Sequence, residues 1–202
     1  MKKVEVIRTY YEENMNKGLP EYKVLGWESE EAQRLRFNSL IFSVDMAGKK
    51  ILDVGCGMGN LLEYLNLKGI QVDYTGVDIL KSMIEQAGRK GLNGTFYHAD
   101  IFEKNIFQNN SFDIIYASGI FNLNLNNNRK FLSNALRLFM DLSKEAVVFN
   151  LLHHKSPDKE EPYYYFDPEE VKDIVEELPQ RVKTMKIVEN YLNNDFTVVC
   201  RK

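Results

Sequence analysis

The chain has little of what marks secreted or membrane proteins. It contains two cysteines, Cys56 and Cys200, whose surroundings suggest no disulfide framework. No apolar run approaches the length that spans a membrane, and the charged N-terminus lacks the apolar segment of a signal peptide. We therefore expect a cytoplasmic protein that does not enter a membrane.

A surplus of positive charge is also missing. The 26 Lys and Arg residues are outnumbered by 29 Asp and Glu residues, and the formal net charge is -3. The backbone of a nucleic acid usually binds a basic face, so nucleic acid is not a favoured partner, although a local basic patch would not show in the total. With 44% hydrophobic residues, the 202-residue chain can form one α/β core and is too short for two domains of ordinary size.

The most informative stretch is ILDVGCGMGN, residues 51–60. Its apolar run, residues 51–54, predicts a strand that is covered on both faces of a parallel sheet. Gly55, Gly57 and Gly59 then predict a sharp turn into a helix, because residues without a Cβ let backbone N–H groups approach a ligand closely.

Asp53, an acid in this stretch, discriminates between two kinds of ligand. A nicotinamide or flavin dinucleotide places its pyrophosphate at such a turn, usually with the spacing G-x-G-x-x-G, whereas this chain has Asn60 at the third glycine position. Asp53 would repel a pyrophosphate but attract an ammonium group. A nicotinamide-dependent oxidoreductase is therefore disfavoured. S-adenosylmethionine, which carries a sulfonium, an ammonium and no phosphate, is favoured.

The segment DVGCGMG, residues 53–59, resembles motif I of the Rossmann-like (class I) S-adenosylmethionine-dependent methyltransferases, whose pattern is D-x-G-x-G-x-G. The resemblance implies a methyltransferase with S-adenosyl-L-methionine as its cofactor. It also implies that the residues of this turn surround the cofactor, namely Asp53, Gly55, Cys56, Gly57, Gly59 and Asn60. Nothing in the sequence indicates a metal site.

Two later motifs support the resemblance. Asp78 follows the next expected strand and could accept hydrogen bonds from both ribose hydroxyls of an adenosyl group, or could merely cap the following helix. Asp100, in the segment HADI, resembles the acid of the family's adenine-binding motif, with a surface turn as the alternative. Ile79, Met83 and Ile101 would then contact the adenosyl group, although a methionine at this spacing is more often plain core.

The fourth expected strand ends in small residues. Ala117 and Ser118 would leave room for the methionine arm of the cofactor at the carboxyl edge of the sheet. This position lacks the Asn/Asp-Pro-Pro-Tyr signature of relatives that methylate amino groups of bases or of glutamine. We therefore expect a small-molecule methyl acceptor. An RNA or protein acceptor, or a non-catalytic partner subunit that keeps the cofactor site, is the alternative.

The acceptor itself should be covered by segments that reach over this edge. The candidates for catalysis are Asn122, His153, His154 and Tyr165, the last within a run of three tyrosines that begins at Tyr163. A histidine could take a proton near neutral pH, and tyrosines could line a small pocket. The alternative is that these histidines are solvated and the tyrosines pack on the core. Trp27 and Arg36 should lie near the methionine end of the cofactor.

The order of elements predicts an α/β, doubly wound fold with a mostly parallel, seven-stranded sheet closed by a C-terminal β-hairpin. Five βα units should precede the hairpin, whose halves span residues 181–191 and 196–200. We divide the chain into an accessory N-terminal helix and loop, residues 1–27, and a methyltransferase domain, residues 28–202, which the resemblance covers. Residues 21–27 and 150–165 should form loops.

Overall fold

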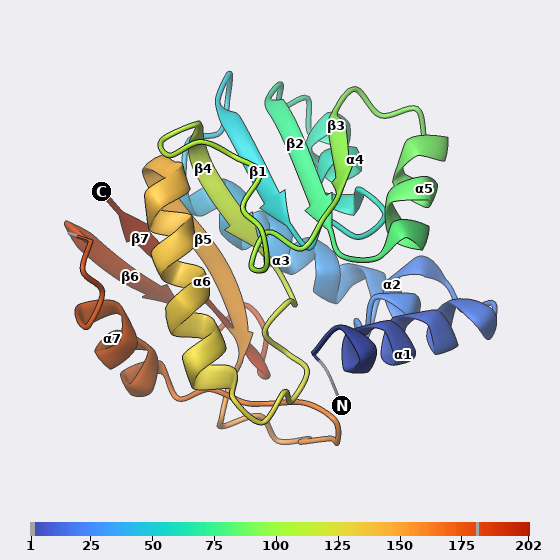
Figure 1. Cartoon of the computed structure of the whole chain (residues 1–202). Coiled ribbons are helices and arrows are strands. Elements are labelled where there is room, and N and C mark those ends of the chain that lie inside the picture. The colour runs from blue at the N-terminus through green and yellow to red at the C-terminus, as the bar shows by residue number, and fades with distance from the viewer. Residues whose placement is uncertain (1–2, 181) are drawn as a thin grey trace.

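Seven strands form one sheet in the order β3-β2-β1-β4-β5-β7-β6 (Figure 1). The computed structural model describes residues 3–180 and 182–202. Among the described strands, β7 runs antiparallel to its neighbours and the others are parallel to one another. The bounds are β1 Lys50–Val54, β2 Asp73–Asp78, β3 Thr95–His98, β4 Phe112–Ala117, β5 Ser143–Leu152, β6 Thr184–Val188 and β7 Asp195–Arg201. The predicted fold class, a mostly parallel seven-stranded sheet with a closing hairpin, is confirmed.

Helices cover both faces of the sheet, which explains the continuous apolar run in β1. Ile51 faces the core beneath α3 and α4, whereas Leu52 faces the core beneath α6 and α7. Successive residues of a strand point to opposite faces, so every central position must be apolar unless it has another role. The helices are α1 Lys3–Asn16, α2 Glu21–Val24, α3 Glu30–Ser43, α4 Asn60–Leu67, α5 Lys81–Arg89, α6 Asn128–Leu142 and α7 Pro168–Glu176. No described helix is long and apolar enough to cross a membrane.

Local signals set the starts of several elements. The Ser29 hydroxyl accepts a hydrogen bond from the amide of Ala32 at the start of α3, and the Asp167 carboxylate caps α7, with Pro168 in its first turn. Between β1 and α4, Gly55, Gly57 and Gly59 have φ of 74°, 54° and 77°. These left-handed conformations favour glycine, so the predicted glycine turn is confirmed.

Four expectations about local structure are wrong. Residues 21–24 form the helix α2 because the amide of Val24 bonds back to the carbonyl of Pro20. The strand β5 continues to Leu152, since Asn150 pairs with Thr197 of β7. The connection from β3 to β4 contains turns and no helix, so it is not a βα unit. The strand β6 begins at Thr184; the start of that expected half, residue 181, lies outside the described residues.

The N-terminal segment lies across the sheet's carboxyl edge. In Figure 1, α1 and α2 sit beyond the ends toward which the arrows of β1, β2 and β3 point. The first two residues of the expected accessory segment are outside the described part of the chain. This placement puts α1 where a ligand at the carboxyl ends of the strands would need a cover.

Candidate functional site

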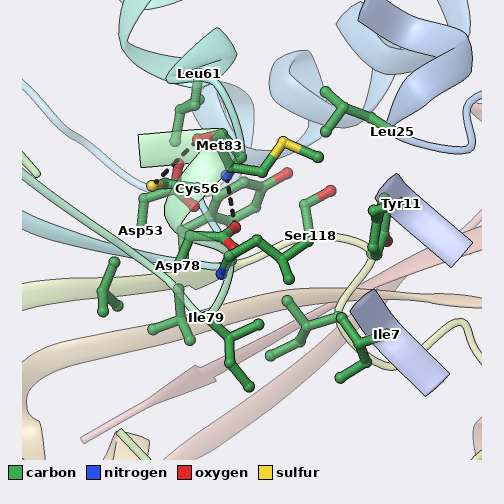
Figure 2. A pocket seen from close by; sticks show the side chains of 18 of the residues that line it. Ile7, Tyr11, Leu25, Asp53, Cys56, Leu61, Asp78, Ile79, Met83 and Ser118 are labelled. Atoms are coloured by element: carbon green, nitrogen blue, oxygen red, sulfur yellow. Dashed lines mark hydrogen bonds between the residues drawn. The ribbon is translucent and has the colours of Figure 1, made fainter. Parts of the chain in front are cut away.

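A cavity opens at the carboxyl ends of β1, β2 and β4 and is covered by α1 (Figure 2). Its floor contains the turn between β1 and α4, including Gly55, Cys56 and Gly57. A Cβ on Gly57 would lie 3.0 Å from Cδ2 of Leu25, which itself lines the cavity. The absence of a side chain at Gly57 therefore keeps space between the turn and its cover.

Asp53 lies at the bottom of the cavity and is almost completely buried. Its Oδ2 accepts a hydrogen bond from the hydroxyl of Tyr74 at 2.5 Å. Burial raises the pKa of Asp53 to about 7; the Tyr74 bond lowers this pKa, and the nearby Asp78 raises it. A cationic ligand would stabilise the ionised form of Asp53, because the Tyr74 hydroxyl that bonds to it is a neutral donor.

Asp78 ties the glycine turn to the end of β2. Its Oδ2 accepts a hydrogen bond from the amide of Gly57 at 2.9 Å, and its Oδ1 accepts one from the amide of Leu80 at 2.8 Å. Burial raises its pKa, and the amide hydrogen bonds lower it. Each carboxylate oxygen can accept more than one hydrogen bond, so Asp78 can stabilise the turn and still receive a donor from the cavity.

At the other end of the cavity lie Asp100, Ile101 and the rings of Phe102 and Phe131. Nζ of Lys3 is 3.0 Å from Oδ2 of Asp100 and about 5 Å from each ring centroid. The Oδ2 atom is buried, and this ion pair lacks the alignment of a hydrogen bond. Asp100 thus keeps an acceptor atom that a better-placed N–H group could use.

The opposite wall carries neutral polar groups. Oη of Tyr116 and Oγ of Ser118 are buried, and neither makes a well-formed hydrogen bond within the described chain. Gln33, on the first turns of α3, also lines the cavity, beside Phe37 and Trp27. Buried polar atoms without partners are costly, so this wall fits a ligand that supplies hydrogen-bonding groups.

The cover is the face of α1 that carries Lys3, Ile7 and Tyr11, spaced four residues apart. Figure 2 shows Ile7 and Tyr11 facing the side of the cavity that holds Asp53 and Asp78. A hydrogen bond of 2.6 Å joins the hydroxyls of Tyr10 and Tyr163 and links α1 to the segment after β5. No residue of α1 is fully buried, whereas α3 and α6 each bury several.

Most of the residues expected around the cofactor line the cavity. These are Asp53, Gly55, Cys56, Gly57, Asn60, Asp78, Ile79, Met83, Asp100, Ile101, Ser118 and Trp27. Gly59 and Ala117 are not part of the lining, and Arg36 is paired with Asp195 outside it. The sequence did not single out Lys3, Ile7, Tyr11, Leu25, Gln33, Phe37 and Tyr116. The four-residue spacing on α1 was the available signal, but it does not say what that face covers.

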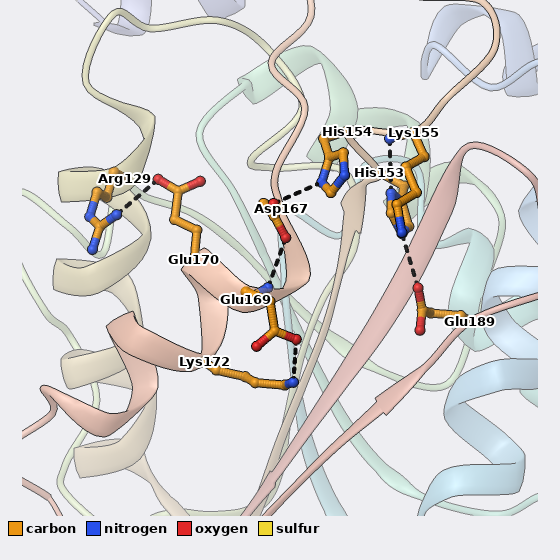
Figure 3. Close-up of polar contacts among 9 residues, drawn as sticks. All are labelled: Arg129, His153, His154, Lys155, Asp167, Glu169, Glu170, Lys172 and Glu189. Carbon is orange, nitrogen blue, oxygen red and sulfur yellow. Dashed lines mark hydrogen bonds and ion pairs between the residues drawn. The ribbon is translucent and has the colours of Figure 1, made fainter.

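The acceptor candidates are not gathered at the cavity. Nε2 of His153 is 3.0 Å from Glu189 and its Nδ1 accepts the amide of Lys155, while His154 lies 3.4 Å from Asp167 (Figure 3). The hydroxyl of Tyr165 accepts a hydrogen bond from the amide of Glu160. Asn122 adjoins the turn after β4, with its Oδ1 buried and unpartnered, but it is not part of the lining.

Comparisons with known proteins find methyltransferases. Residues 51–141 match the family described as methyltransferase domain. A protein of Mycobacterium tuberculosis that is named as a methyltransferase is 28% identical over 161 residues, which cover 75% of this chain and 92% of that protein. These matches support a class I S-adenosylmethionine-dependent methyltransferase. S-adenosylmethionine is the methyl donor of this methyltransferase.

Solved structures share the fold of the methyltransferase. The magnesium protoporphyrin IX methyltransferase of Synechocystis PCC 6803, solved with bound S-adenosylhomocysteine, has a TM-score of 0.69 at 13% identity, and the match covers 100% of both chains. A methyltransferase of Aquifex aeolicus has a TM-score of 0.66 at 22% identity, covering 91% of this chain and 98% of that one. Identities this low show the fold and leave the methyl acceptor open.

Proposed function

We propose that the cavity holds S-adenosylmethionine along a line of three carboxylates. Asp100 and Ile101 would receive the adenine, Asp78 the ribose hydroxyls, and Asp53 the region of the ammonium group. The support is the chemistry of the lining. The buried Asp78 carboxylate and the buried Oδ2 atom of Asp100 suit the hydroxyl and amino donors of the adenosyl group, and the third carboxylate suits a cation. Ser118, Tyr116 and Gln33 would then adjoin the methionine end.

The acceptor in this proposal is a small, uncharged and largely apolar molecule. The observation that carries it is the distribution of charge: the charged residues of the described lining, Lys3, Asp53, Asp78 and Asp100, all lie along the cofactor's proposed path. The wall at Trp27 is aromatic, with neutral groups on Gln33, Tyr116 and Ser118. An ionised group buried there would have no partner, which is costly.

The chain's own residues would mainly orient the reactants and exclude water. When bound, S-adenosylmethionine supplies an electrophilic methyl carbon, whose bond to sulfur breaks as the acceptor's lone pair forms the new bond. The histidines expected as bases are engaged elsewhere, and burial raises the pKa of Tyr116, which therefore keeps its proton at neutral pH. The acceptor atom should then be nucleophilic by itself, and any proton it loses passes to water.

The test is production of S-adenosylhomocysteine with a panel of acceptors. Matched pairs of neutral aromatic or heteroaromatic compounds and their carboxylated or phosphorylated analogues should give turnover with the neutral members. Turnover with charged analogues alone, or with RNA or protein alone, would contradict the proposal. Cofactor binding without product from any pool would favour a non-catalytic partner subunit.

The division of the chain also becomes a proposal. We infer that α1 and α2 are an accessory cover on a domain that begins near residue 28. The support is that α1 contributes Lys3, Ile7 and Tyr11 to the lining while none of its residues is fully buried.

A further inference from the structure

At the aromatic wall of the cavity and directly behind it, five residues from distant parts of the chain form a closed ring of contacts. They are Trp27, Arg36, Asp195, Asn150 and Gly119. The guanidinium of Arg36 lies over the Trp27 ring at 4.4 Å, and its Nε donates to Oδ2 of Asp195 at 2.9 Å. Nδ2 of Asn150 donates to the same carboxylate, and its Oδ1 accepts the amide of Gly119 at 3.1 Å.

Gly119 closes the ring against the indole. It has φ of 81°, and a Cβ at this position would lie 2.9 Å from Cη2 of Trp27. The edge of the indole therefore packs against the backbone of the turn that carries Ser118. Trp27, Ser118 and Gly119 all line the cavity, whereas Arg36, Asn150 and Asp195 do not.

The buried ion pair between Arg36 and Asp195 is a poor way to gain folding stability. The Arg36 side chain is 3% exposed and that of Asp195 is fully buried. Burying both charges costs desolvation that an apolar pair of similar size would avoid. Nη1 of Arg36 also donates to the carbonyl of Ala32, so hydrogen bonds to Asp195 and Ala32 together hold the guanidinium over the indole.

Asn150 links this pair to the turn after β4. Its side chain is completely buried at the carboxyl end of β5, with its oxygen committed to Gly119 and its nitrogen to Asp195. The hydroxyl of Tyr191 donates to Asp195 as well, and it also bonds to the hydroxyl of Thr197. All the polar atoms of Asn150 and Asp195 thus serve to hold other groups, and none faces the cavity.

We propose that Arg36, Asn150 and Asp195 are positioning residues for methyl transfer. They hold the Trp27 indole and the Ser118–Gly119 turn at a fixed spacing, where the methyl group and the acceptor meet. This inference rests on the proposed function for the assignment of that end of the cavity. Small displacements matter there, because transfer requires the reacting atoms to be aligned.

The protein contains a single tryptophan, so the fluorescence of Trp27 reports on this wall directly. We would compare the 202-residue wild type with Asn150→Ala, which opens the ring, and with Arg36→Lys, which keeps the charge but loses the planar guanidinium. The control is Leu136→Ala, a buried substitution on α6 outside the cavity, chosen to lower stability without touching the ring. Acrylamide quenching is measured at a temperature where every variant is fully folded.

In both ring variants we expect the quenching constant of Trp27 to rise about twofold or more, since an indole freed from its neighbours is more accessible. The affinity for S-adenosylhomocysteine should fall by about three- to tenfold, or kcat should fall more than KM once an acceptor is known. Leu136→Ala should change neither. If Asn150→Ala does not fold, Arg36→Lys and Gly119→Ala, which pushes a methyl group onto the indole, carry the same test.

Unchanged quenching and affinity in the folded ring variants would overturn the proposal. Equal changes in Leu136→Ala would overturn it too, because the effect would then follow stability. A wild type that does not bind S-adenosylhomocysteine would instead contradict the proposed function. The quenching comparison of the unliganded variants would still decide whether the ring positions Trp27.

Discussion

The hydroxyl of Tyr74 donates a hydrogen bond to Oδ2 of Asp53 over 2.5 Å, and both side chains are buried. The phenol is a neutral donor, so it offsets only part of the cost of burying the carboxylate, and the pKa of Asp53 rises to about 7. A cationic ligand would offset the remaining cost of burying this carboxylate. We therefore expect ligand affinity, stability and pH to be coupled at Asp53.

We predict that S-adenosylmethionine binds more weakly as the pH falls from 7 to 5. Protonation of Asp53 in the free protein removes the charge that attracts the ligand's ammonium, at a cost of up to about tenfold in affinity per pH unit. Calorimetric titration across this range measures the effect. Asp53→Asn should abolish the dependence, whereas Glu176→Gln, an exposed control on α7, should keep it. A flat profile in the wild type would contradict the prediction.

The same carboxylate should make the unliganded protein less stable at high pH. Its folded pKa of about 7 lies above its ordinary value of 3.8, so the folded state binds more protons than the unfolded state between these values. The free energy of unfolding then falls as the pH rises through this window. Asp53→Asn should be more stable than wild type by about 1–3 kcal/mol at pH 7.5, with little difference at pH 4. Urea denaturation at both pH values provides the measurement.

Asp78→Ala should weaken the binding of S-adenosylhomocysteine by about 1–3 kcal/mol, the usual cost of leaving buried donors unpaired. It should also lower the melting temperature, because the amides of Gly57 and Leu80 lose their acceptor. Asp73→Ala is the matched control, since it removes an exposed aspartate from the other end of the same strand. Equal affinity in the two variants, measured by calorimetry, would show that Asp78 does not hold the ribose.

Gly57→Ala should reduce cofactor affinity by at least about tenfold, since its Cβ would meet Leu25 and disturb the turn at the cavity. Gly69→Ala provides the control: Gly69 also has a left-handed φ, 70°, but no atom lies within 4 Å of its Cβ position. Both substitutions carry similar backbone strain, so thermal stability should fall in both. Affinity should fall in Gly57→Ala alone; a similar loss in both variants would mean that strain, not the site, is responsible.

His153→Ala and His154→Ala should leave the affinity for S-adenosylhomocysteine within about twofold of wild type, because neither side chain lines the cavity. His153→Ala should still lower stability, since the ring packs edge-on against Phe196 and bonds to Glu189. Binding calorimetry and thermal melting separate the two effects. If turnover with an identified acceptor falls sharply in either variant, that histidine takes part in the reaction and the prediction is wrong.

The sequence by itself determined the fold and identified three acids that line the cavity. The apolar run of β1, the three glycines with left-handed backbone, and the acids Asp53, Asp78 and Asp100 are local patterns, each readable within a few residues. Parallel strands bring their carboxyl ends to one edge, so the order of the elements was enough to place these acids around one cavity. The Ser29 and Asp167 caps are local in the same sense.

Only the tertiary structure decided which side chains from distant parts of the chain contact one another. Arg36 looked available for the cofactor, but Asp195, 159 residues later, pairs with it. The adjacent histidines are held by Glu189 and Asp167, and Asn150, expected in a loop, joins the pair behind Trp27. The spacing of Lys3, Ile7 and Tyr11 also did not predict that α1 covers the cavity. A local pattern fixes which way a side chain points along its own element, whereas its partner is set by how the whole chain packs.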